Sequence, residues 1–496
     1  MRVSQSLGGP RVRRKIDAYL VVAVVLCSSI GGQAEAQGFY YRSIPIGERA
    51  LGMGGAYTGI AHDPSAAYYN PGGIMSGGRF QLLGSLSSLV FTRRTIDGAF
   101  DSEDIDSNFK SKATTTLPHF IGTVVKMGKP KFGDRRFAMA FSSLEVARED
   151  LGVGFTEVQP EASTDLRLGD YSSMRWWGVS FGAQVTRRVS VGVSTFLSRQ
   201  SGNYFDDLGV STGGTLEPTG LRVGGDSVTS STEVSLKAYH FVFRLGSLYR
   251  INPKWQVGFM LQPPGIPLKQ TGNVYRRLTE DVSPDASRYF IFDRNGLDAR
   301  APIPFELRVG FEYKINRLTT LSFDASVHGP GRAGSVFERP SELEGYDGRL
   351  GGYFANSTTR RWTPNLAIGA EHLFGKVVVS GGLFTNVSAA PNVPATSDVY
   401  RHDQVSMFGA SFALGVDAKG YRLTLGATGY YGRGDALALI LDSDTFSGSY
   451  ERTKATISAV VVYVAGAVSV AAKGAKQIET KYKERKANND AEEGGD

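Results

Sequence analysis

The residue types that most often carry catalysis or bind metals are few and scattered in this sequence. It has six histidines and one cysteine among 496 residues, and the spacing of the histidines matches no zinc-binding pattern. Gly52, Gly54 and Gly55 do not form a dinucleotide fingerprint, because Tyr57 occupies the third glycine position and no strand pattern precedes them. The G-x-S-x-G motif of serine hydrolases is also missing. We therefore predict that the protein is not an enzyme and uses no cofactor and no metal.

The most unusual segment is the glycine-rich stretch from Glu48 to Ile74. Its Asp63–Pro64 and Asn70–Pro71 pairs are turn formers, and "PSAAYYN" predicts a short helix with proline at its first position. Glycines, including Gly52, Gly54 and Gly55, permit tight turns and close backbone approach. Tyr68 and Tyr69 need burial, which argues against the alternative of a flexible linker. We predict that residues 37–77 form one compact unit.

The stretch before this unit predicts a secretory signal peptide over residues 1–36. A basic region around Arg13 precedes an apolar run that is too short to span a bilayer, and Ala34–Glu35–Ala36 fits the cleavage rule. A retained anchor and lipidation at Cys27 are the alternatives. Residues 1–36 hold five basic and two acidic residues, so cleavage lowers the net charge from +7 to +4. This mild charge gives no reason to expect nucleic acid as a partner.

The elements that must hold the glycine-rich unit are predicted to be long strands. In "FELRVGFEYKI", apolar residues from Phe305 to Ile315 alternate with polar residues and glycine. A period of two indicates a strand with one apolar and one polar face. We predict fourteen such strands, near 78–94, 116–128, 136–149, 170–184, 189–202, 232–250, 255–270, 303–315, 319–330, 361–374, 377–388, 404–418, 421–434 and 453–466.

The strands and connections together predict a β-barrel in the bacterial outer membrane. Soluble strands average about 5–6 residues, whereas about 9–11 are needed to cross a membrane. Short turns, such as 251–254, alternate with long polar connections, such as 203–231, 271–302 and 331–360, which is the outer-membrane arrangement. We expect an all-β, fourteen-stranded antiparallel transmembrane barrel over residues 78–468, a charged periplasmic tail over 469–496, and a monomer. A β-sandwich is the alternative, since it also shows alternation.

This alternation assigns the polar face to the lumen. Glu306, Arg308, Glu312 and Lys314 should face inward. Arg308 is the candidate partner for a carboxylate solute, but we expect it instead to pair with Glu306 or Glu312. The apolar face should contact lipid, with an interfacial girdle of aromatic residues: Trp176, Trp177, Tyr249, Trp255, Tyr313, Trp362, Tyr430 and Tyr431. The acidic segments 101–108 and 293–298 are expected to be solvated loops, the alternative being contact with lipopolysaccharide through divalent ions.

A fourteen-stranded barrel is too wide for its own wall side chains to fill, since about eight strands already give a filled interior. Without a plug, it would leak. We therefore predict that residues 37–77 fold back into the lumen as a hatch, with residues 78–468 forming the wall around it.

The segment from Arg49 to Ile74 resembles the N-terminal signature of the FadL/TodX family of outer-membrane transport proteins. The shared elements are "LGMGGA", "A-x-DPSA" and "YNP". The resemblance implies a fourteen-stranded barrel with a hatch, and passive uptake of hydrophobic molecules such as long-chain fatty acids or hydrocarbons. It also implies gating at Asn70, Pro71 and Gly72, although the family has alanine where this sequence has Gly72. We add Tyr68, Tyr69 and Asp63 to this predicted gating group.

The resemblance further implies lateral release of the substrate into the membrane at a kinked third strand. In this sequence Ser142, Ser143 and Glu145 interrupt the apolar face of that strand and predict the kink. A similar signature occurs in PorV-like barrels of type IX secretion, so a scaffold that acts through protein partners is the alternative function. The partners we expect for the transporter are hydrophobic small molecules and the lipids and lipopolysaccharide of the outer membrane.

Overall fold

The computed structural model describes residues 40–41, 45–78, 80–102, 105–117, 120–127, 136–158, 162–212, 215–216, 222–223, 225–281, 287–331, 337, 359–397, 403–418, 420–442 and 447–470. The predicted leader, residues 1–36, and nearly all of the predicted tail, residues 469–496, lie outside these ranges. Among the described residues, no helix has both the length and the apolar character needed to cross a membrane.

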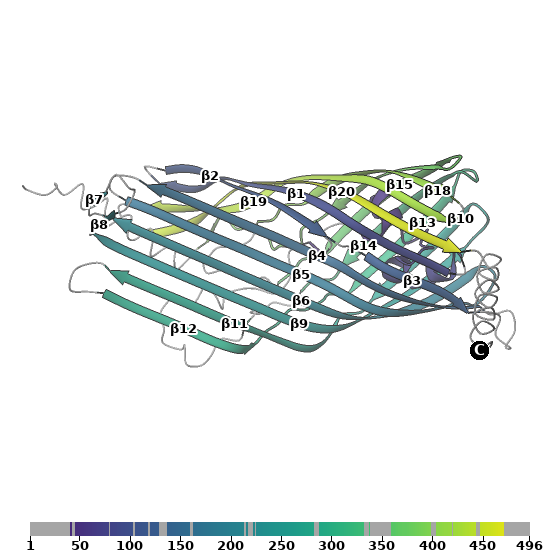
Figure 1. The fold of residues 1–496 in the computed structure, drawn as a ribbon, viewed down its shortest axis with the longest axis horizontal. Helices are drawn as coiled ribbons and strands as arrows, with labels where there is room; N and C mark the ends of the chain where they lie inside the picture. Colours follow the sequence, from purple (N-terminus) through teal and green to yellow (C-terminus); the bar gives the residue numbers. More distant parts are fainter. Residues whose placement is uncertain are drawn as a thin grey trace, which may run out of the picture.

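The strands form one closed antiparallel barrel in which the chain crosses the wall fourteen times (Figure 1). Eleven crossings are single strands: β1 (Phe80–Ser102), β4 (Phe137–Val158), β5 (Ala162–Gln184), β6 (Val189–Thr212), β9 (Asp226–Arg250), β14 (Thr319–His328), β15 (Thr363–Phe374), β16 (Val377–Asn386), β18 (Met407–Ala418), β19 (Tyr421–Asp442) and β20 (Ser447–Val470). Three crossings consist of two strands each: β2 (Ile105–Leu117) with β3 (Phe120–Met127), β10 (Trp255–Gln262) with β11 (Ile266–Asp281), and β12 (Ser287–Asp298) with β13 (Glu306–Lys314). The pairing of Phe80 with Val470 closes the barrel between β1 and β20.

Each predicted strand coincides with one of these crossings, and their alternation defines the outside of the barrel. Along β13, Glu306, Arg308 and Glu312 are buried, whereas Leu307 and Phe311 are each 40% exposed. A β-sandwich would bury the apolar residues instead, so this alternative is wrong. An apolar outer face around a charged interior is the arrangement that suits a strand with lipid on one side.

Several strands continue far beyond their predicted ends. Residues 203–231 and 271–302 were expected to be long loops, but β6 continues to Thr212, β11 to Asp281, and β12 covers Ser287–Asp298. The acidic segments 101–108 and 293–298 are likewise mostly strand, in β1, β2 and β12. Along β11 the inward Val274, Arg276 and Leu278 are buried and the outward Asn273 and Arg277 are exposed, so this extension lacks the apolar outer face that marks the predicted strands. Two short pairs, β7 (Thr215–Leu216) with β8 (Arg222–Val223) and β17 (Thr396–Ser397) with β20, add to these extensions.

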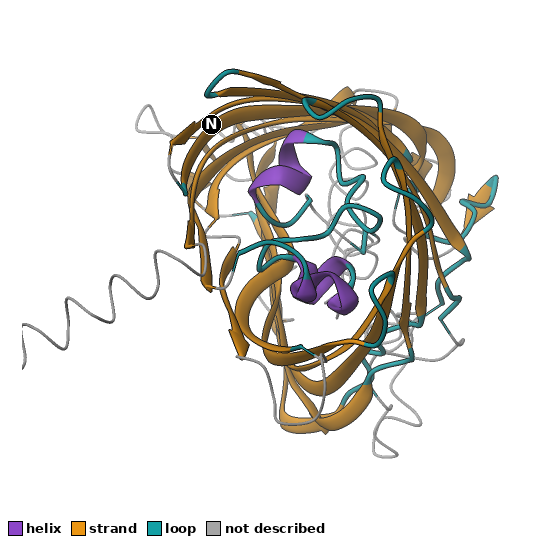
Figure 2. Ribbon diagram, turned by 90° about the vertical axis from the view of Figure 1, so that its right-hand side faces the viewer, coloured by secondary structure: helices purple, strands orange, loops and turns teal. Residues whose placement is uncertain are grey.

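The N-terminal segment, defined here as residues 45–78, lies inside the ring of strands (Figure 2). It contains the helices α2 (Glu48–Gly52) and α3 (Ala66–Tyr69) and the 3₁₀ helix η1 (Pro71–Met75). Most of its residues are buried, including Ala50, Tyr57, Tyr69 and Ile74 at 0% exposure. The largest group of buried apolar residues therefore lies between the segment and the inner face of the wall. A second group, which includes Val234, Val274 and Phe292, lies among β9, β11 and β12.

Candidate functional site

The inner face of the wall is shaped to receive the backbone of the N-terminal segment. Six inward glycines lie against it where a side chain would collide, on β6, β9, β10, β13, β15 and β16: Gly192, Gly246, Gly258, Gly310, Gly369 and Gly382. Glycines on paired strands lie directly opposite each other: Gly192 is opposite Gly246, and Gly258 is opposite Gly310. Because glycine lets two backbones approach closely, this glycine belt fixes the depth at which the segment sits.

The predicted gating residues Asn70, Pro71 and Gly72 lie at the centre of this contact. The Asn70 side chain donates from Nδ2 to the Ser247 carbonyl at 2.9 Å and accepts from the Gly72 N–H at 3.1 Å. The Gly72 carbonyl in turn accepts from Ser190 Oγ at 2.9 Å. A Cβ on Gly72 would lie 3.0 Å from the Ser190 carbonyl oxygen, so the glycine at this position brings η1 close to β6.

The other predicted members of the gating group have different surroundings. Tyr68 packs on the ring of Trp176 with centroids 5.9 Å apart, and the Tyr69 hydroxyl accepts from the Ile46 N–H at 2.9 Å. Asp63 accepts from the Ser65 N–H at 2.8 Å, which stabilises the turn before α3. Tyr68 therefore faces the lumen wall, whereas Asp63 organises the segment internally.

Of the predicted glycines, Gly54 and Gly55 have positive φ angles of 65° and 85°, a conformation that L side chains rarely adopt. Gly52 has no such angle, but a Cβ there would meet Ser380 and, at 3.1 Å, Ala413. Turn geometry thus explains two of these glycines, and close packing on β16 and β18 explains the third.

One side of the lumen carries a buried ionic cluster. Arg308 pairs with Glu306, as expected, and Arg244 pairs with the same carboxylate at 2.8 Å. All three side chains are 1% exposed. The Arg244 guanidinium also stacks 3.9 Å from the Tyr68 ring centroid and donates to Gln262 at 2.9 Å. The cluster therefore links the N-terminal segment to β9 and β13, since charges buried this deeply persist only when they are paired and hydrogen-bonded.

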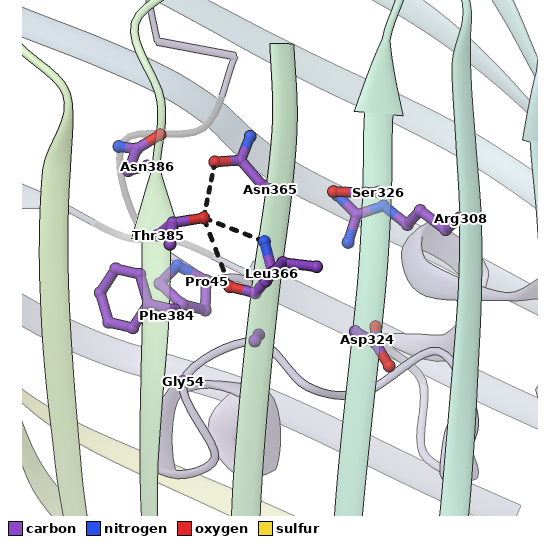
Figure 3. A pocket seen from close by; sticks show the side chains of 12 residues that line it. Pro45, Gly54, Arg308, Asp324, Ser326, Asn365, Leu366, Phe384, Thr385 and Asn386 are labelled. Atoms are coloured by element: carbon purple, nitrogen blue, oxygen red, sulfur yellow. Dashed lines mark hydrogen bonds between the residues drawn. The ribbon is translucent and has the colours of Figure 1, made fainter.

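A small cavity adjoins this cluster between Pro45–Gly55 and the wall of β13–β16 (Figure 3). Its volume is about 30 Å³, room for one or two waters. Arg308, Asp324, Asn365 and Thr385 give it a polar lining. Arg308 Nη2 has no hydrogen-bond partner there, although its charge is already matched by Glu306. The cavity is suited to water and is too small for a long apolar solute.

A second ionic network holds the segment at the end with the short turns. Arg49 binds Glu371 of β15 at 2.9 Å, and Arg422 of β19 lies 3.8 Å from the same carboxylate. Glu48 accepts a hydrogen bond from Thr424, yet burial raises the pKa of its carboxyl to about 7. Burial and the nearby Arg49 guanidinium lower the pKa of His62 to about 4. This end therefore contains one group that titrates near neutral pH, Glu48, and one that titrates well below it, His62.

The wall next to the Arg308 cluster, formed by β4, β5 and β6, is apolar. Tyr68 packs there with Trp176 and Met174 of β5, Phe196 of β6, and Leu144 and Val146 of β4. Trp176 was expected in the interfacial girdle, which is wrong, because it is 2% exposed and faces inward, while Trp177 is 39% exposed. The lumen thus has a charged side and an apolar side, and Tyr68 contacts both.

The apolar side ends at an irregularity in the third crossing. The ladder of β4 with β5 shifts register between Glu145 and Ala147. On its other side, β4 pairs with β3 only over Phe137–Leu144 in the described residues, whereas its ladder with β5 continues to Val158. Glu145 is buried and paired with Arg175 at 3.1 Å. The register shift therefore begins at Glu145, the last of the residues Ser142, Ser143 and Glu145 that were predicted to mark a kink.

These predicted residues form two groups in space. The segment residues from Gly52 to Gly72 gather around the glycine belt and the Arg308 cluster, while Ser142 and Glu145 lie at the β4 irregularity. Arg244 and the glycine belt were not predicted from the sequence. The inward direction of Arg244 could have been predicted, because its neighbour Leu245 is apolar and faces outward. Among the described residues, no three of His, Cys, Asp and Glu are grouped to hold a metal ion.

Known structures share this architecture. A FadL homologue of Pseudomonas aeruginosa matches 87% of the chain and 99% of its own at 14% identity and a TM-score of 0.53. The match to the toluene transporter TodX of P. putida covers 87% of this chain and 99% of TodX, at 14% identity and a TM-score of 0.52. The match to the monoaromatic hydrocarbon channel CymD covers 86% of this chain and 98% of CymD, at 14% identity and a TM-score of 0.50. No family model and no curated protein matches the sequence. At these identities the likeness establishes a shared fold.

Proposed function

We propose that this chain belongs to the FadL/TodX family and is an outer-membrane transporter for passive uptake of hydrophobic molecules, such as long-chain fatty acids or hydrocarbons. The proposal is supported by the fold shared with a FadL homologue, TodX and CymD and by the N-terminal signature. The role of residues 37–77 as a hatch and of Asn70, Pro71 and Gly72 as its gate belongs to the same proposal.

The observation that carries this proposal is the apolar side of the lumen. Its side chains run from Tyr68 on the N-terminal segment to Val146 beside the β4 irregularity. A solute in contact with this surface gains about 0.8 kcal/mol for each CH₂ group removed from water. Release through the wall next to β4 into the membrane keeps those groups out of water, so no energy source is required.

The charged side has the complementary role of holding the segment. Arg244 and Arg308 converge on Glu306 beneath Tyr68 and Tyr69, and Arg49 ties α2 to β15. The segment is held by these ion pairs and by hydrogen bonds from Ser190 and Ser194 of β6, whereas Leu144 of β4 and Trp176 of β5 pack against it through apolar contacts. Such a segment is able to shift away from β4 and β5. We propose that such a shift opens the apolar route.

The test is uptake of labelled oleate and labelled hexadecane by cells with and without the protein. Leu144→Asn places a polar group on the apolar route and should lower uptake several-fold. The matched control is Leu437→Asn, because Leu437 is also a buried leucine but belongs to β19, outside the Tyr68–Val146 cluster. Uptake equal to that of cells lacking the protein, for both solutes, would refute transport.

The alternative function, a PorV-like scaffold, predicts a different result in the same uptake experiment. A scaffold acts through protein partners, so neither solute would be taken up, and loss of the chain would impair export of its cargo proteins. The apolar surface inside the barrel favours transport over this alternative.

A further inference from the structure

Three polar side chains on the apolar side of the lumen have no hydrogen-bond partner. Trp176 Nε1, Ser198 Oγ and both amide atoms of Gln200 are buried without one. The residues are 2%, 0% and 1% exposed. Leaving such a group buried and unpaired costs about 1–3 kcal/mol, and four such atoms in one place call for a physical reason.

These side chains lie next to one another on the inner face of β5 and β6. Trp176 is directly opposite Ser198 in the ladder, and Met174 is opposite Gln200. Opposite residues on one face have Cβ atoms about 4.5–5.5 Å apart, and diagonal neighbours such as Trp176 and Gln200 remain within reach of long side chains. Ser194, two positions below Phe196 on the same face, donates to the Ala67 carbonyl at 2.7 Å, so this face looks into the lumen.

The chemical character of the group is neutral. It offers an indole N–H, a hydroxyl, and an amide with one acceptor oxygen and one donor nitrogen. The guanidinium of Arg244 lies 5.1 Å from the Trp176 ring, but its donors already bind Gln262, Glu306 and the Tyr68 carbonyl. An ionised carboxylate brought here would be buried without a partner, which is costly.

We propose that Trp176, Ser198 and Gln200 bind the uncharged hydroxyl head of an otherwise apolar molecule, a long-chain alcohol, during its passage through the barrel. The hydroxyl oxygen accepts from Trp176 Nε1 and from Ser198 Oγ, and the hydroxyl hydrogen is donated to Gln200 Oε1. The tail lies on Met174, Leu144 and Val146, which lead to the β4 irregularity. This inference rests on the proposed uptake of hydrophobic molecules and narrows its substrate class.

The test is photo-crosslinking in the purified full chain reconstituted in lipid nanodiscs. The probe is a dodecanol analogue with a diazirine on the carbon next to the hydroxyl. Peptides containing residues 174–176 and 198–200 should carry the label, and excess dodecan-1-ol should displace it, whereas dodecane and dodecanoate should not. Gln200→Leu should reduce labelling roughly five- to tenfold, the loss expected for one hydrogen bond of about 1–1.4 kcal/mol.

The matched control is Gln184→Leu, which changes the same residue type at the turn end of β5 and should label as the wild type does. Ser198→Ala serves as a second variant should Gln200→Leu fail to fold. Labelling elsewhere in the chain, unchanged labelling in both site variants, or equal displacement by dodecanoate would overturn the inference. Cellular uptake of dodecanol is measured in parallel. If uptake is absent but the site is labelled, the transport proposal is refuted and the binding site is not. If uptake is present but the label lies outside the site, only the binding site is refuted.

Discussion

Replacement of Gly246 by alanine should displace the N-terminal segment from the wall. A Cβ at this position would collide with Asn70 Oδ1 and lie 2.5 Å from Pro71 Cδ. Ordinary carbon contacts are about 3.5–4.0 Å, so η1 has to move by about 1 Å. The hydrogen bonds from Asn70 Nδ2 to the Ser247 carbonyl and from Ser190 Oγ to the Gly72 carbonyl, both 2.9 Å, would then exceed hydrogen-bonding distance.

The size of the effect follows from these two bonds. Each contributes about 1 kcal/mol, so their loss shifts the balance between the seated and displaced segment by about 2 kcal/mol, or roughly 30-fold. The assay is ion conductance across planar bilayers, with proteolysis of the segment as a second readout. Gly246→Ala should raise the fraction of time spent conducting and the cleavage rate.

The control is Gly381→Ala on β16, where the nearest atom to an added Cβ is the Ser411 carbonyl oxygen at an ordinary 3.6 Å. It should behave as the wild type does. Conductance and protease protection of Gly246→Ala that match both the wild type and this control would show that the glycine belt does not set the position of the segment.

Three further changes probe other parts of the structure. Glu306→Ala leaves Arg244 and Arg308 buried without their carboxylate and should lower the free energy of unfolding by about 3–5 kcal/mol, measured by urea unfolding in lipid vesicles; a loss below 1 kcal/mol would contradict the buried cluster. Burial raises the pKa of Glu48 from 4.5 to about 7, so the folded state keeps a proton that the unfolded state releases: stability is highest below pH 4.5 and should fall by about 3 kcal/mol as the pH rises through 7, a fall that Glu48→Gln should remove in unfolding measured between pH 4 and 8. Leu245→Arg places a charge on the outer apolar face and should cost about 2–4 kcal/mol if that face contacts the bilayer midplane; an unchanged yield of folded barrel in vesicles would argue against lipid contact there.

Much of the barrel could be predicted because alternation is a property of each strand alone. In β13 the sequence of Glu306, Leu307 and Arg308 sets which faces are charged and which are apolar, whatever the neighbouring strands are. The composition of Glu48–Ile74 likewise indicated a compact buried unit, because Tyr68 and Tyr69 need burial and glycines such as Gly54 permit the turns. In the extension formed by β11 the apolar residues Val274 and Leu278 point inward and are buried. The apolar outer face used to recognise a strand is therefore missing there, and the predicted strands were too short.

Only the tertiary structure decided which distant residues meet. Arg244 and Glu306 are brought together by the pairing of β9, β10 and β13, and Gly246 faces Asn70 because closure of the barrel sets the height of each strand against the N-terminal segment. The inward direction of Trp176 rather than Trp177 depends on register, since a shift of one residue turns every side chain of a strand to the other face. Periodicity therefore determined inside and outside for strands with clear alternation, such as β13, while the composition of the lumen depended on strand register and closure, which no single strand encodes.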